Sequence, residues 1–340
     1  MCQYFYFSHP MDFKQRVANV LIHTAFNLFK KFSYFPKLES VIDEQFPEYK
    51  GNRPTLTEMQ NEAALVLQYG HTLIMDGLRP TSPNFIMIGM MKCNPPPPPL
   101  PKDLQEFMDE AEDGVILVSF GSVYQASLMT DELRFTMTSV FKGLKQKILW
   151  KWEAEEMKDK PSNVKLSKWL PQESILAHPN LKLFVTHGGI SSAQEALCYK
   201  KPTVVIPIFG DQLTNAVEAE RQGYGIAIPL PELTSEKLSN AINNILYDPK
   251  FSQRAIEHGT LVMDEMTKPL DRAVWWIEYA LRYPGLKHMK SPVHDLTFIQ
   301  YFLLDVIAFL LVILTAFLYI AVSLCRCCFS KRGSKKCKNE

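Results

Sequence analysis

A glycine-rich segment between an apolar run and a helical pattern is the first place where this sequence could do chemistry. His187, Gly188 and Gly189 follow the apolar stretch 181–186, and helical spacing begins at Ser191. Glycines let a ligand approach the backbone, and the N–H groups and dipole of a helix start favour an anion such as a diphosphate. A tight turn would explain the glycines equally well, and a structural role would explain His187.

Three side chains around this segment have the chemistry to bind a nucleoside. Trp169 lies in an expected loop between strand-like residues 164–166 and the short segment 174–178, where an indole can stack on a base. Gln172 adds a hydrogen-bond donor and an acceptor. Glu195 lies one helical turn after Ser191, where a carboxylate can accept from the two vicinal hydroxyls of a ribose. A core tryptophan and an exposed helical glutamate are the ordinary alternatives.

Asp211 and Gln212 follow the next apolar run, 202–208, and precede another helical pattern. A carboxylate beside an amide can read the hydroxyls of a sugar, whereas an N-cap role explains Asp211 without any ligand. Each pattern is weak by itself, so its value depends on whether the fold brings these residues together.

The elements expected around these residues alternate between strands and helices. Apolar runs and spaced apolar residues predict strand 115–120, helix 130–144, strand 147–152, strand 181–186, helix 191–198, strand 202–208, helix 212–222, strand 225–230 and helices 234–246, 251–266 and 271–283. Such alternation predicts a parallel sheet covered on both faces, which is a doubly wound α/β domain. Ligands bind at the carboxyl ends of such strands, so Gly121-Ser122, 187–192 and 209–212 should converge on one crevice.

The rest of the chain divides at two clear features. Five consecutive prolines, 95–99, favour an extended and semi-rigid linker, and residues 11–45 upstream show amphipathic helical patterning. Near the C-terminus, 306–324 is a stretch of 19 residues without a charge, about long enough to cross a bilayer as one helix. A buried core helix is the alternative.

The residues after this stretch predict an orientation. Lys and Arg beside a membrane span tend to stay in the cytosol, so the basic tail 325–340 should be cytosolic and the large part lumenal. Lys336 and Lys338 resemble a dilysine signal for retrieval to the endoplasmic reticulum, and a solvated basic tail competes with this interpretation.

Composition narrows the functional classes. Lys and Arg number 37 against 36 Asp and Glu, so there is no basic surplus for a nucleic-acid partner. The 340 residues, 46% of them hydrophobic, are enough for roughly two domains with a buried core each. The seven cysteines, at positions 2, 93, 198, 325, 327, 328 and 337, show no disulfide framework or zinc spacing, and no metal site is expected.

From Trp169 to Asn215 the chain resembles the signature of the UDP-glycosyltransferases. The matching pattern, in order, is W-x-P-Q, H-P, T-H-G-G, a glutamate four residues after Ser191, P-x-x-x-x-P-x-F-G-D-Q and a closing asparagine. Residues 11–19, 80–89, 118–122, 269–274 and 294 onward are similar to the animal membrane-bound, glucuronosyltransferase-like branch. The resemblance therefore covers essentially the whole chain.

This resemblance implies an α/β enzyme of the GT-B type. We expect part of an N-terminal, acceptor-side domain over 1–94, a proline-rich linker over 95–101, a Rossmann-like UDP-sugar-binding domain over 102–290, a transmembrane region over 298–324 and a cytosolic tail over 325–340. The implied activity is inverting transfer of glucuronate or another hexose from a UDP-sugar to hydroxyls of small lipophilic acceptors, as in detoxification at the endoplasmic reticulum membrane. The UDP-sugar is a co-substrate, and no further cofactor is implied.

The resemblance also assigns roles to individual residues. Trp169 would stack on uracil, Gln172 would contact the uridine and Glu195 the ribose hydroxyls. The remaining donor-binding positions would be Ser122, His187, Gly189 and Ser192 at the diphosphate, Ser191 where the family usually has asparagine, and Asp211 with Gln212 at the sugar.

The catalytic base is the main departure from the family. Members use a histidine held by an aspartate near the start of the N-terminal domain, and this chain matches only the second half of that domain. His9, His23 and His71 fit no such motif, so we assign no catalytic residue. The alternative hypothesis is a catalytically inactive short form that pairs with full-length relatives and modulates them, and the choice between glucuronate and glucose stays open.

Overall fold

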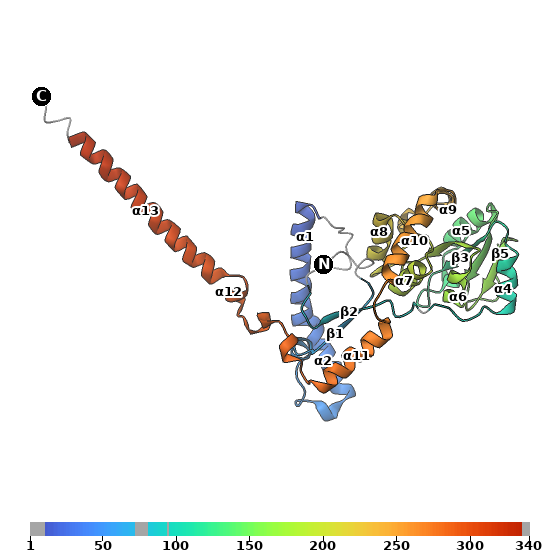
Figure 1. The fold of residues 1–340 in the computed structure, drawn as a ribbon, viewed down its shortest axis with the longest axis horizontal. Coiled ribbons are helices and arrows are strands. Elements are labelled where there is room, and N and C mark those ends of the chain that lie inside the picture. Colours follow the sequence, from blue (N-terminus) through green and yellow to red (C-terminus); the bar gives the residue numbers. More distant parts are fainter. Residues whose placement is uncertain (1–10, 72–80, 94, 335–340) are drawn as a thin grey trace. The chain divides into compact units, whose positions relative to one another are not determined.

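A six-stranded parallel sheet is the central feature of this computed structural model (Figure 1). Its strands are β3 (Val115–Ser119), β4 (Lys147–Lys151), β5 (Val164–Ser167), β6 (Leu181–Thr186), β7 (Thr203–Val205) and β8 (Gly225–Ala227). They lie in the order β5-β4-β3-β6-β7-β8, and every neighbouring pair is parallel. The chain winds outward from β3 in one direction and from β6 in the other, which confirms the predicted doubly wound α/β domain.

The structure describes residues 11–71, 81–93 and 95–334. The predictions for Lys336 and Lys338, and parts of the expected 1–94 and 325–340 segments, lie outside the described residues. Contacts divide the chain into one unit over Met1–Leu286 and a second over Lys287–Glu340. The larger unit contains the sheet and everything before it.

Helices cover both faces of the sheet, as the wholly buried strand β3 requires. On one face, α5 (Asp131–Lys142) and α9 (Ser235–Tyr247) bury Met137, Phe141, Leu238 and Ile242 against the sheet. On the other, α4 (Lys102–Asp109), α6 (Gln172–Ala177) and α7 (Ile190–Cys198) do the same with Leu104, Met108, Ile175, Leu176 and Ala196. The helices α8 (Gln212–Gln222) and α10 (Pro249–Met263) share a third apolar cluster with α7.

Local capping explains where several of these helices begin. The Thr130 side chain accepts from the backbone N–H of Leu133 at the start of α5, and Thr234 does the same for Lys237 in α9. Asp248 caps α10, whose first residue is Pro249. A short polar side chain at the N-cap satisfies a backbone donor that the helix leaves unpaired, and proline fits the first helical position.

The described residues before the proline run form helices and a small sheet. Their elements are α1 (Phe13–Phe29), η1 (Lys30–Tyr34), α2 (Phe35–Gln45), η2 (Pro47–Tyr49), α3 (Leu56–Asn61), β1 (Val66–Tyr69) and β2 (Phe85–Gly89). The two strands pair in parallel, with Tyr69 opposite Gly89. The helix α11 (Pro269–Arg282) packs against β2, and the Arg272 guanidinium donates to the carbonyl oxygen of Met87 at 3.2 Å.

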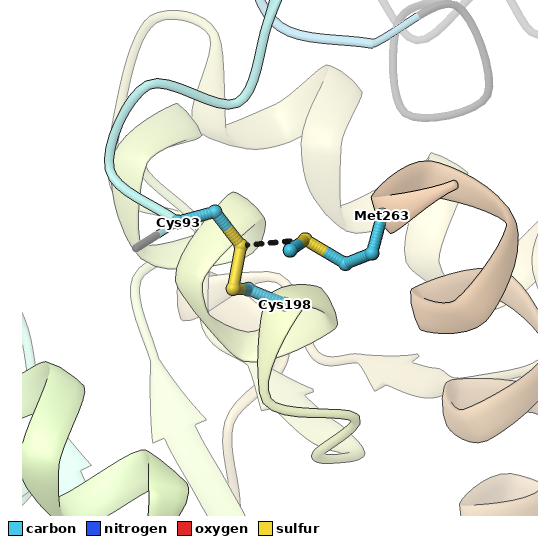
Figure 2. Close-up of a disulfide and its surroundings, with 3 residues drawn as sticks. All are labelled: Cys93, Cys198 and Met263. Atoms are coloured by element: carbon cyan, nitrogen blue, oxygen red, sulfur yellow. Dashed lines mark hydrogen bonds between the residues drawn. A yellow bond between two sulfur atoms is a disulfide. The ribbon is translucent and has the colours of Figure 1, made fainter. Parts of the chain in front are cut away.

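A disulfide between Cys93 and Cys198 joins the segment after β2 to the end of α7 (Figure 2). The two Cα atoms are 5.8 Å apart, and the Met263 sulfur of α10 lies beside the bond. Both half-cystines are buried in the third apolar cluster. The sequence did not reveal this pairing, because the two residues are 105 positions apart.

The second unit consists of short turns and one long helix. Its elements are η5 (Lys287–Met289), η6 (Pro292–Asp295), α12 (Phe298–Tyr301) and α13 (Leu304–Ser334). Residues Leu304–Leu324 have a mean hydropathy of 2.8, and this part of α13 is long and apolar enough to cross a membrane. The rest of the protein does not bury it. The exposed apolar surface argues against the buried-helix alternative.

Candidate functional site

The reversal of winding between β3 and β6 creates the place where a ligand would bind. The turn at Gly121 and Ser122 follows β3, and His187 follows β6, its immediate neighbour in the sheet. A Cβ atom at Gly121 would lie 2.8 Å from Cε1 of His187, so only a glycine allows the turn to approach this ring. The structure thus brings together two of the segments that were predicted to converge.

His187 is held between two glycines. A Cβ atom at Gly189 would lie 2.6 Å from its Nε2 atom, and Nδ1 lies 3.4 Å from the Thr186 hydroxyl. Burial lowers the pKa of His187 to about 4, although the nearby Asp211 carboxylate acts in the opposite direction. The imidazole is therefore neutral at pH 7 and has one N–H to donate.

Gln172, Ser192 and Glu195 form one hydrogen-bonded group. The Gln172 amide donates to Oε2 of Glu195 at 2.5 Å and to the Ser192 hydroxyl at 3.2 Å, which connects the first residue of α6 with α7. Ser192 and Glu195 are buried, with 7% and 6% of their surfaces exposed. Burial raises the pKa of Glu195, and the charge of Glu173 adds to this effect while the Gln172 bond opposes it. An exposed surface glutamate, the ordinary alternative, is therefore wrong.

Asp211 and Gln212 are held by hydrogen bonds from neighbouring backbone N–H groups and from the Asn215 side chain. The Asp211 carboxylate accepts from the Asn215 amide at 2.9 Å and from the Ile190 N–H, the first of α7, at 3.3 Å. The side chain of Asp211 makes no cap bond to its own helix α8, so the N-cap alternative does not explain it. Buried Gln212 accepts from the N–H groups of Ile208 and Phe209 through Oε1 at 2.9 and 3.0 Å.

Trp169 and Ser122 lie at the solvent-exposed edge of this region. Trp169 is 74% exposed just before α6, which excludes the alternative of a core tryptophan, and the Ser167 hydroxyl donates to its carbonyl oxygen at 2.7 Å. Ser122 is exposed in the turn after β3. An indole with this exposure is available for stacking.

The structure places two further residues here that were not predicted from the sequence. The Lys151 ammonium, at the end of β4, donates to the carbonyl oxygen of Gly121 and to the Glu153 carboxylate, both at 2.8 Å, and so holds the turn after β3. The sequence signal for Lys151 was a cationic residue near the end of the predicted strand 147–152, which is β4 next to β3 in the sheet. Tyr69, at the end of β1, lies near Ser191 and Glu195, and no sequence pattern indicated this.

The arrangement suits recognition of a polar ligand that carries an anion and hydroxyl groups. A buried carboxylate is an acceptor for hydroxyls, and a neutral imidazole beside the first turn of α7 is a donor for an anion. Among the residues that the structure describes, no group of three or more His, Cys, Asp and Glu residues is placed to hold a metal ion.

Comparisons with known proteins agree with these features. Residues 2–339 match the model of the family described as UDP-glucoronosyl and UDP-glucosyl transferase. The chain is 37% identical over 317 residues to UDP-glucuronosyltransferase 2B13 of Oryctolagus cuniculus, and the matched residues make up 93% of this chain and 58% of that protein. It is 34% identical over 335 residues to UDP-glucuronosyltransferase 2B15 of Homo sapiens, and the matched residues make up 97% of this chain and 61% of that protein. This chain thus spans about three fifths of the length of these relatives.

Two solved structures share the fold. One is the glycotransferase of kitacinnamycin, with a TM-score of 0.59, 22% identity and coverage of 80% of this chain and 68% of that one. The other is the spinosyn forosaminyltransferase SpnP, with a TM-score of 0.51, 18% identity and coverage of 60% and 52%. These likenesses confirm the predicted GT-B type of fold.

Proposed function

Because the chain belongs to the UDP-glucoronosyl and UDP-glucosyl transferase family, we propose that it is the donor-binding portion of an enzyme that transfers glucuronate or another hexose from a UDP-sugar. The acceptor would be a hydroxyl of a small lipophilic molecule, and the transfer would invert the anomeric carbon. The observation that carries this proposal is the grouping of Gln172, Ser192 and Glu195 beside His187 at the switch point of the sheet. The UDP-sugar is a co-substrate, and the proposal includes no further cofactor and no metal ion.

The nucleoside would bind at the exposed end of the site. Trp169 would present its indole to uracil, and its 74% exposure supports this role. Gln172 would turn its amide toward the uridine. The buried Glu195 carboxylate would accept from the ribose hydroxyls, which supply the hydrogen-bond donors that a desolvated carboxylate needs.

The diphosphate would lie between the turn after β3 and the start of α7. His187 would donate its N–H without a charge of its own, and Ser122, Ser191 and Ser192 would add hydroxyl donors. Gly189 would let the phosphates approach the backbone because it has no side chain. Position 191 is usually asparagine in the family that this chain resembles. The Ser191 hydroxyl can still donate to a phosphate, but its side chain is shorter than that of asparagine.

The hexose would lie next to Asp211 and Gln212. Oε1 of Gln212 already accepts two backbone N–H groups, so its contribution to a sugar would be the amide N–H₂. The Asp211 oxygen Oδ2 accepts from Asn215 and Ile190, which leaves Oδ1 as the oxygen for a sugar hydroxyl.

In an inverting transfer a base removes the proton of the acceptor hydroxyl, the oxygen attacks the anomeric carbon, and UDP leaves from the opposite face. We propose that this chain binds the donor and stabilises the negative charge that develops on the departing diphosphate, through the start of α7 and His187. No residue of this chain is proposed as the base.

The proposed location is the membrane of the endoplasmic reticulum, with the sheet domain in the lumen and the basic tail in the cytosol. The apolar helix Leu304–Leu324 supports a single membrane span. The Cys93–Cys198 disulfide supports the lumenal side, because disulfides persist in oxidising compartments and are rare in the cytosol.

Calorimetric titration of the full chain in detergent micelles with UDP, UDP-glucuronate and UDP-glucose tests the donor site. Loss of base stacking in Trp169→Ala should weaken UDP binding by roughly 1–3 kcal/mol. Trp275→Ala is the matched control, because it removes a half-exposed indole on α11, outside the proposed site.

The outcomes separate the hypotheses. Binding that weakens in Trp169→Ala and not in Trp275→Ala supports the donor site, and the ranking of the two UDP-sugars identifies the hexose. Because no residue of this chain is proposed as the base, binding without transfer is expected under both hypotheses; a changed activity of a full-length relative when this chain is added would favour the inactive form that modulates relatives. A folded chain that binds none of the three ligands would refute the proposal.

A further inference from the structure

The helix α1, blue in Figure 1, exposes a continuous apolar stripe. None of its 17 residues is buried. Five of its large apolar side chains are spaced so that they share one face of the helix, and we call them the α1 stripe: Phe13, Val17, Val20, Leu21 and Leu28. Their exposed fractions run from 43% for Val17 to 72% for Phe13. Single exposed apolar residues are ordinary, whereas a contiguous stripe of them marks an interaction surface.

The opposite side of α1 is the one that the protein partly covers. Gln15, Ala18, Asn19 and Ile22 are only partly exposed, and helical geometry places them opposite the α1 stripe. The side-chain oxygen of Asn19 is shielded from solvent. The α1 stripe is therefore not the face by which this helix packs within the chain, and it needs a different explanation.

The charges around the α1 stripe have one sign. Residues 13–38 contain no Asp or Glu, and their basic residues are Lys14, Arg16, Lys30, Lys31 and Lys37. Lys14 and Arg16 are exposed, and helical geometry places one at each margin of the α1 stripe. Long basic side chains can lay their aliphatic stems along apolar groups while their charges stay in water. An apolar stripe with a cation at each margin suits the boundary between hydrocarbon and anionic headgroups.

A lipid bilayer fits these features better than another protein does. Interfaces between proteins are depleted in Lys, whereas helices that lie on membranes combine Lys and Arg on the polar side with Phe and Leu on the other. The same chain contains Leu304–Leu324, which is apolar and long enough to cross a membrane. A single span of this kind would supply a lipid surface to the rest of the chain.

We propose that α1 docks on the surface of a bilayer, with the α1 stripe at the edge of the acyl chains and with Lys14 and Arg16 among the headgroup phosphates. The helix would lie in the interface and would not cross the membrane, because its opposite side carries polar residues such as Gln15 and Asn19. This contact would be a second membrane attachment besides the span. The inference goes beyond the proposed function, since it requires neither a nucleotide nor a transfer reaction.

Photocrosslinking of the full chain in liposomes tests whether the α1 stripe touches lipid. The photoreactive residue p-benzoylphenylalanine replaces Leu21 in the α1 stripe, Phe26 on the other side of the same helix, or Phe135 on α5, which is 66% exposed. After illumination, mass spectrometry of the peptides measures the yield of lipid adduct at each position. Because an interfacial helix buries only its apolar face, we expect roughly 5-fold more lipid adduct at position 21 than at position 26 or 135.

Val20→Glu perturbs the contact without touching the core. Val20 is 63% exposed, so the melting temperature in detergent should stay within the error of the wild-type value. A charge in the α1 stripe is costly at the acyl chains, so the lipid adduct at position 21 should fall roughly 5-fold. Phe135→Glu is the matched control, because it puts the same charge on an equally exposed apolar residue of α5 and should leave the adduct at position 21 unchanged.

The lipid composition tests the charge argument. Liposomes that contain anionic lipid should give more adduct at position 21 than purely zwitterionic liposomes, and high salt should remove this difference. The proposal is overturned if position 21 gives no more lipid adduct than position 135, or if Val20→Glu leaves the yield unchanged. A crosslink from position 21 to a second polypeptide in place of lipid would also overturn it, because the α1 stripe would then be a protein interface.

Discussion

Replacement of His187 by glutamine should remove a defined part of the pH dependence of stability. Burial lowers the pKa of His187 from 6.5 to about 4, so the unfolded chain binds a proton between these values and the folded chain does not. The stabilising contribution is therefore complete above pH 6.5 and is lost as the pH falls toward 4. A shift of this size corresponds to roughly 3 kcal/mol in all, of which about 2 kcal/mol is lost between pH 7.5 and pH 5.

The assay compares urea unfolding of the full chain in detergent at pH 7.5 and pH 5.0, followed by tryptophan fluorescence, in wild type and His187→Gln. The other titrating groups are common to both proteins, so their effects cancel in the comparison. Wild type should lose about 2 kcal/mol more than the variant on acidification. Carbon-13 NMR of labelled histidines measures the pKa directly, with His187→Gln identifying the signal.

The same titration connects stability with ligand binding. If the neutral His187 imidazole faces the diphosphate, saturating UDP should raise its pKa, because a nearby negative charge favours the imidazolium. A His187 that titrates near 6.5 without ligand, together with equal acid sensitivity in both proteins, would refute the burial argument. An unchanged pKa in the presence of bound UDP would instead remove His187 from the diphosphate contacts.

Two further predictions concern packing and covalent structure. Gly259→Ala should destabilise the fold by about 1–3 kcal/mol, because a Cβ atom there would lie 2.2 Å from the carbonyl oxygen of Leu197. Gly143→Ala is the control: its Cβ atom would lie 3.5 Å from the nearest atom, so this variant should be neutral or stabilising in the same thermal melt. Equal melting temperatures for these two variants would contradict the close α7–α10 contact. Cys93→Ser should lower the melting temperature, because the disulfide closes a long loop and is worth about 2–5 kcal/mol. A reducing agent should bring wild type to the same value without changing the variant, and a wild type that does not respond to reduction would show that the bond does not form.

Most of the sheet domain could be predicted because its strands are uninterrupted apolar runs. Strand 181–186 and helix 212–222 agree with β6 and α8, and helix 251–266 differs from α10 only at its ends, where Asp248 caps the start. The predicted strand 225–230 is longer than β8, since the chain leaves the sheet after Ala227 and Leu230 begins a 3₁₀ turn. Apolar content alone does not show where a strand ends.

The missed features depend on tertiary contacts. Helix α4 was not predicted because only Leu104 and Met108 are buried among its polar residues. Of the candidate site, the sequence indicated the residues that follow strands or begin helices. It could not indicate the Cys93–Cys198 pair or the position of Tyr69, which depend on segments more than 100 residues apart in the chain.

The disulfide has a consequence for how the integrity of this protein is judged. The backbone between Cys93 and Cys198 includes the largely exposed prolines 95–99 and other surface loops that a protease can reach. A single cut anywhere in this interval leaves two pieces joined through sulfur, and a non-reducing gel would still show one species near 39.0 kDa. A nicked population would become visible only after reduction, as two shorter polypeptides whose masses locate the cleavage site.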